Sequence, residues 1–137
     1  MTTNGGMKRT TVPPATESST PFSRARATYG AASLAVLETI ARDKLLDRVN
    51  VAGGRLHHGL QKLVEKYPDK AKEVRGRGLL KGLAVDGDAT PYVARAREKG
   101  VLLSVAGGTV VRFVPPFVVT DAELDEGVAA LDYALQS

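Results

Sequence analysis

Apolar side chains at helical spacing open the ordered part of the chain. Leu34, Leu37 and Ala41 fall three and four residues apart, which predicts a helix over residues 31–41.

A second helical pattern follows directly. Asp43 is placed to cap it, and Pro68 ends it because the residue before a proline is driven out of the α region. Gly53 and Gly54 weaken its middle, so we expect close packing against another element there. Its apolar positions are Leu45, Leu46, Val49, Ala52, Leu56, Leu60, Leu63 and Val64.

The next segment, Val74–Val85, predicts one strand that ends in an Asp-Gly-Asp turn. Thr90 is placed to cap a third helix, with Pro91 at its favoured first position. Gly100 is the glycine expected beyond the end of that helix.

A hairpin and a last helix complete the pattern. Strands are predicted at Val101–Val105 and Thr109–Val114, joined by an Ala-Gly-Gly turn. Thr120 and Glu123 form a capping box at the start of the last helix. The apolar stripe of this helix is Leu124, Val128, Leu131 and Leu135.

The predicted order α-α-β-α-β-β-α indicates an α+β fold, a small and largely antiparallel sheet with helices packed on one face. The length of 137 residues and the 43% of hydrophobic residues suit one domain. With no cysteine, the chain has no disulfide framework and no thiolate metal site. No apolar run is long enough for a membrane span, and no secretory signal is evident, so we expect a cytoplasmic protein.

The N-terminal 28 residues differ from the rest. They are rich in Thr, Ser, Pro and Gly, and four basic residues against Glu17 account for +3 of the chain's net +4. We expect residues 1–28 to be a disordered or degenerate segment and residues 29–137 to form the domain, with order beginning near Thr28 or Tyr29. A transit peptide is a less favoured reading of the basic segment. The nearly neutral remainder argues against a nucleic-acid or membrane-surface binder.

Two segments carry a more specific signal. One reads Val-Arg-Gly-Arg-Gly-Leu-Leu-Lys-Gly-Leu, at residues 74–83. The other, residues 100–116, contains Ala-Gly-Gly, then Val-Arg-Phe and Pro-Pro, and precedes the capping box. In this order and spacing they resemble the C-terminal small domain of class III aminotransferases, most closely those that act on acetylornithine. The helix over residues 30–40 resembles the helix by which that family enters the small domain.

The resemblance implies a reaction that moves an amino group between N-acetylornithine and 2-oxoglutarate with pyridoxal phosphate, as in arginine biosynthesis. In the family, the Schiff-base lysine and the aspartate at the ring nitrogen lie in the large domain, and no segment here resembles that region. Lys81, inside a predicted strand, does not match the lysine. We therefore expect no catalytic residue in this chain and no activity from the chain alone.

Arg112 matches the family arginine that grips the substrate α-carboxylate, and a guanidinium suits that role because it offers two parallel donors. The alternative is a solvent-facing residue of an alternating strand. Thr20 stands nearest the family threonine that reaches the cofactor phosphate of the neighbouring subunit. Because Pro21 interrupts that motif and its glycines and asparagine are absent, a disordered tail is the favoured reading of Thr20.

Other candidates are weaker. His57 and His58 are adjacent on a helix and point apart, so they are expected to be surface or groove-lining residues, and no metal site is predicted. Arg75 and Arg77 could bind an anion, although solvated charges are the default. Three functions remain to compare: an aminotransferase piece that completes a large domain supplied separately, a non-enzymatic interaction or oligomerisation module, and the disfavoured nucleic-acid or membrane binder. A homo-oligomer is expected under the first two.

Overall fold

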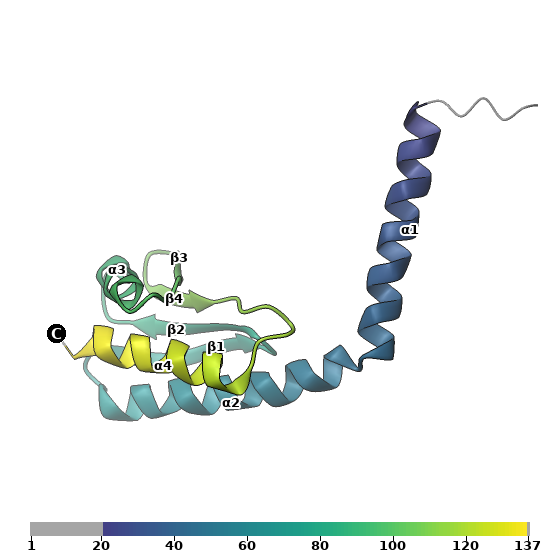
Figure 1. The fold of residues 1–137 in the computed structure, drawn as a ribbon. Coiled ribbons are helices and arrows are strands. Elements are labelled where there is room, and N and C mark those ends of the chain that lie inside the picture. Colours follow the sequence, from purple (N-terminus) through teal and green to yellow (C-terminus); the bar gives the residue numbers. More distant parts are fainter. Residues whose placement is uncertain (1–20, 137) are drawn as a thin grey trace, which may run out of the picture. The chain divides into compact units, whose positions relative to one another are not determined.

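The structure, a computed structural model, describes residues 21–136. Its four strands form one antiparallel sheet in the order β1-β2-β4-β3, which confirms the predicted α+β class (Figure 1). The elements are α1 (Pro21–Arg42), α2 (Leu45–Lys66), β1 (Ala71–Arg77), β2 (Leu80–Val85), α3 (Thr90–Glu98), β3 (Ser104–Ala106), β4 (Val110–Phe113) and α4 (Asp121–Leu135).

The single strand predicted over residues 74–85 is wrong, because this segment forms two strands. Arg77 of β1 pairs with Leu80 of β2, so only Gly78 and Leu79 connect them. Gly78 has a φ of 50°, a left-handed conformation that glycine adopts without steric cost. The Gly76-x-Gly78 sequence therefore leads into a turn, although the residues around it have the composition of a strand.

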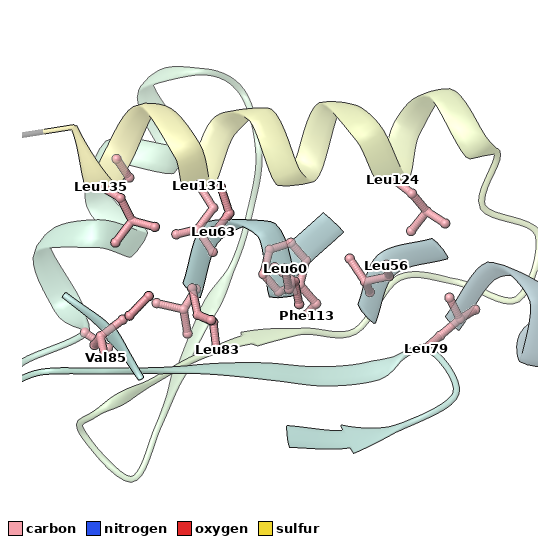
Figure 2. Packing of buried hydrophobic residues seen from close by; sticks show 14 of the residues in the cluster. Leu56, Leu60, Leu63, Leu79, Leu83, Val85, Phe113, Leu124, Leu131 and Leu135 are labelled. Atoms are coloured by element: carbon pink, nitrogen blue, oxygen red, sulfur yellow. The ribbon is translucent and has the colours of Figure 1, made fainter. Parts of the chain in front are cut away.

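The core lies between the sheet and the paired helices α2 and α4 (Figure 2). The predicted stripe of α4 is confirmed, since three of its leucines are buried and Val128 is half-buried against them. The leucines of α2 meet this stripe, and the sheet closes the core from the other side. The large side chains that fill it are Leu56, Leu60, Leu63, Leu79, Leu83, Val111, Phe113, Leu124, Leu131 and Leu135.

Helix α2 ends before Pro68 as predicted, but it does not begin as predicted. Lys44, in a left-handed conformation with φ 48°, occupies the N-cap position without a side-chain cap, and Asp43 pairs with Arg42 instead. The expectation of close packing holds for Gly53, where a β-carbon would clash with the turn at Gly78. It is wrong for the adjacent Gly54, which has open space beside it.

The caps of the two later helices contrast. The Thr120–Glu123 capping box of α4 is confirmed, with both reciprocal bonds present. The cap predicted for Thr90 is wrong, because Thr90 is already inside α3, and its backbone N–H and hydroxyl both donate to Asp88. Gly100 follows α3 with a φ of 80°, as expected for a C-terminal glycine.

Helix α1 begins at Pro21, ten residues before the predicted start at residue 31. The first turn of a helix accepts proline because its missing N–H would have no helical partner there. The chain divides into two compact units after Glu38, within this helix. The apolar residues Leu34 and Leu37 of the predicted stripe are both exposed. Residues 21–28 belong to this helix, so the expectation that order begins near Thr28 or Tyr29 is wrong. Residues 1–20 lie outside the described part, and the disorder predicted for them stays a prediction.

Candidate functional site

Arg112 lies on β4, an inner strand of the sheet, on the face that turns away from the core. Its strand neighbours Val111 and Phe113 are buried, while Arg112 itself is exposed, which is the alternation expected of a half-buried strand. Its cross-strand partners are Gly82 of β2 and Ser104 of β3, and Gly82 pairs in turn with Arg75 of β1. These four residues therefore form one row across the sheet, and we call it the Arg112 row.

The Arg112 side chain is held by its neighbour in this row. Its Nε–H donates to the Ser104 hydroxyl oxygen at 3.0 Å. Within residues 21–136, no carboxylate forms an ion pair with Arg112. Its two terminal NH₂ groups are thus available to an external carboxylate, as the resemblance implies.

Sequence reasoning missed Ser104. The predicted turn Ala106-Gly107-Gly108 would have set Ser104 opposite Val110, whereas the observed pairing of Ala106 with Val110 sets it opposite Arg112. A shift of the turn by one residue decides which side chains meet across a hairpin. The register of the hairpin, and with it the Ser104 contact, comes only from the structure.

Arg75, the other arginine of the Arg112 row, differs from Arg112. Arg75 forms an ion pair with Glu73 on its own strand, so its charge is already compensated. Arg77 is exposed at the end of β1, beside Leu80 of β2.

The described residues do not by themselves fit pyridoxal phosphate. Lys81 is buried on the core side of β2, and its Nζ donates to the Gly76 carbonyl at 3.0 Å. An ammonium held in this way is not presented to a cofactor aldehyde, which agrees with the view that Lys81 is not the Schiff-base lysine. Thr20, the candidate for the phosphate contact, lies outside the described residues.

The remaining candidates assemble no second site. His57 and His58 are exposed on α2, as expected. A groove of about 380 Å³ runs between α2 and α4, with Leu63 and Val128 in its wall, and the Lys66–Asp132 ion pair borders it. In the part of the chain that the structure covers, no three histidine or acidic side chains gather in a way that could hold a metal ion. No helix from residue 21 to 136 is long and apolar enough to span a bilayer.

Comparison with known proteins identifies the family of the chain. Residues 22–135 match the family model for class III aminotransferases. The chain is 45% identical over 109 residues to an acetylornithine aminotransferase from Synechocystis, an alignment that covers 77% of this chain and 25% of that protein.

Solved structures of aminotransferases resemble the chain in fold as well. A lysine aminotransferase from M. tuberculosis superposes with a TM-score of 0.71 at 31% identity, over 74% of this chain and 24% of that one. An acetylornithine aminotransferase from Elizabethkingia anophelis gives a TM-score of 0.68 at 28% identity, over 75% of this chain and 28% of that one. The chain thus spans about a quarter of the length of these relatives. Because the family model covers nearly all the described residues, the protein belongs to the class III aminotransferases.

Proposed function

We propose that this chain is the substrate-gripping small domain of a transaminase that moves an amino group between N-acetylornithine, or a close relative, and 2-oxoglutarate. In this proposal Arg112 binds the α-carboxylate of the amino donor. The observation that supports it most strongly is the Arg112 guanidinium itself, exposed, bonded at Nε and without an acidic partner in the described residues.

The chemistry of the guanidinium suits this role. Arginine presents a planar fork whose parallel N–H groups match the two oxygens of a carboxylate, and this match fixes the orientation of the substrate as well as its position. Gly82 beside Arg112 has no side chain that could cover the guanidinium. The sheet backbone gives the arginine a rigid base, which favours precise positioning.

Pyridoxal phosphate, the cofactor of this family, supplies the electron sink for such a reaction when it is bound. The described residues offer no Schiff-base lysine, so in this proposal large-domain sequence supplies that group. The contribution of this chain is then to bind and orient the substrate, and the site is complete only in the assembled enzyme, in a cytoplasmic and homo-oligomeric form.

Exposed apolar side chains support an assembly of this kind. Tyr29, Leu34 and Leu37 of α1 are each more than half exposed, at 73%, 57% and 63%. Leu34 and Leu37 are three residues apart and share one side of the helix, and contiguous exposed apolar surface marks a site that meets another protein. The same observation favours the second candidate, a non-enzymatic interaction or oligomerisation module derived from this domain.

A chimera separates the two candidates. Residues 21–137 are joined to the large domain of a related active acetylornithine aminotransferase, and the chimera is compared with its Arg112→Lys variant. Losing one bidentate, charge-assisted contact should lower kcat/KM for N-acetylornithine by about one to two orders of magnitude. An Arg77→Lys variant, on the same face but outside the Arg112 row, serves as the matched control.

An active chimera whose kcat/KM is unchanged by Arg112→Lys for every amino donor would show that Arg112 does not bind the substrate. A chimera that folds and associates but has no activity would favour the interaction module.

A further inference from the structure

We infer that Ser104 is a positioning residue for Arg112: it occupies the Nε–H donor, so that a carboxylate must be gripped end-on by the two terminal NH₂ groups. This inference rests on the function proposed for Arg112 and adds the residue that sets its geometry. Three observations carry it.

The first observation is the hydrogen bond itself. The Arg112 Nε–H donates to Ser104 Oγ at 3.0 Å, an ordinary length for this kind of bond. The two residues are direct cross-strand partners, so their side chains lie on the same face and meet without any bend in the backbone.

The second observation concerns the donors that remain. A guanidinium has five N–H groups, and it can bind a carboxylate either through Nε and one NH₂ group or through both NH₂ groups. With Nε–H occupied by Ser104, only the second arrangement is open. Ser104 therefore determines the direction from which a carboxylate approaches Arg112.

The third observation is the local charge. Ser104 is half-buried and neutral, so it holds the guanidinium without cancelling its charge. Arg75, in the same row, shows the contrast, since its guanidinium is paired with the Glu73 carboxylate. A neutral partner orients an arginine that must still attract an anion, whereas an acidic partner would compete with the substrate.

The hydrogen bond is tested on the full 137-residue chain by NMR of the arginine Nε–H groups, with the Arg112 signal assigned from its loss in Arg112→Lys. We expect its exchange with water to be slower than that of Arg77 in the native chain and in Ser104→Thr, which keeps the hydroxyl. In Ser104→Ala the exchange should rise to the rate of Arg77. Equal exchange in the native chain and in Ser104→Ala would overturn the inference.

The consequence for binding is tested in the chimera described above. Ser104→Ala should raise KM for N-acetylornithine by about three- to tenfold with kcat nearly unchanged, the effect of losing one hydrogen bond that orients the binding group. Ser104→Thr should restore KM. The matched control is Thr109→Ala, which removes a hydroxyl from the same hairpin without touching Arg112.

The outcomes are distinguishable. If Arg112→Lys lowers kcat/KM of the chimera and Ser104→Ala leaves KM unchanged, the positioning role of Ser104 is wrong while the function proposed for Arg112 stands. If Arg112→Lys also has no effect, the proposed function fails and the inference fails with it.

Discussion

Gly53 of α2 packs on the backbone of Gly78 in the turn between β1 and β2. A β-carbon at Gly53 would lie 2.8 Å from the Gly78 Cα, and closer still to its carbonyl group. The missing side chain thus allows α2 to approach the β1–β2 turn at backbone distance. The neighbouring Gly54 has nothing within 4 Å of an added β-carbon.

These two adjacent glycines should respond in opposite ways to alanine. Gly53→Ala should lower the free energy of unfolding by about 1–3 kcal/mol, because the methyl group forces α2 away from the turn. Gly54→Ala should raise it by about 0.5–1 kcal/mol, because alanine is the better helix former and meets no neighbour. Urea unfolding of both variants measures the two changes. A stabilising Gly53→Ala would mean that α2 does not pack on the turn.

Leu131 lies at the centre of the core, with none of its surface exposed. Leu131→Ala should reduce the free energy of unfolding by about 2–5 kcal/mol, the usual cost of truncating a core leucine. Leu102 is 75% exposed, and Leu102→Ala should change stability by less than about 0.5 kcal/mol. Denaturant melts that show equal effects for the two variants would contradict the packing of α4 on the sheet.

The ion pair between Arg55 of α2 and Asp125 of α4 should make stability depend on pH. The hydrogen bond from Arg55, at 3.0 Å, lowers the pKa of the Asp125 carboxyl below its ordinary value. A carboxyl whose pKa is depressed by folding stabilises the folded state above its unfolded pKa of about 4, and this contribution is lost as pH falls through the folded pKa.

Asp125→Asn should therefore be less stable than the native chain at pH 7, and the difference should close as pH falls below about 4. Thermal melts between pH 7 and pH 2.5 measure it. Glu126, the next residue of α4, forms no ion pair in the described residues, so Glu126→Gln is the control. A difference that persists unchanged at pH 2.5 would show that Asp125 acts through packing and not through its charge.

Lys81 provides a test of the cofactor assignment. Because the Lys81 residue is buried and its ammonium donates to the Gly76 carbonyl, it should not react preferentially with pyridoxal phosphate. Borohydride reduction of the isolated chain with the cofactor, followed by peptide mapping, should give only scattered labelling of exposed lysines. Stoichiometric labelling of a single lysine would overturn this expectation.

Features that depend on local chemistry could be predicted from the sequence. The capping box at Thr120 and the stripe that contains Leu131 both follow from spacing within one helix, and the structure confirms both. The exposed position of Arg112 follows in the same way from alternation along one strand. The resemblance to class III aminotransferases, read from two short segments, is confirmed by a family match over residues 22–135.

Features that depend on contacts between distant segments could not be predicted in this way and follow from the fold. The sequence pattern around Gly78 predicts one strand, whereas the antiparallel pairing of β1 with β2 shows two. The two adjacent glycines of α2 look alike in sequence, and only the position of the turn packed against Gly53 distinguishes them. Ser104 meets Arg112 because of the hairpin register, which a shift of one residue would change. Such contacts are set by cross-strand geometry and packing, which the spacing of residues along one segment does not specify.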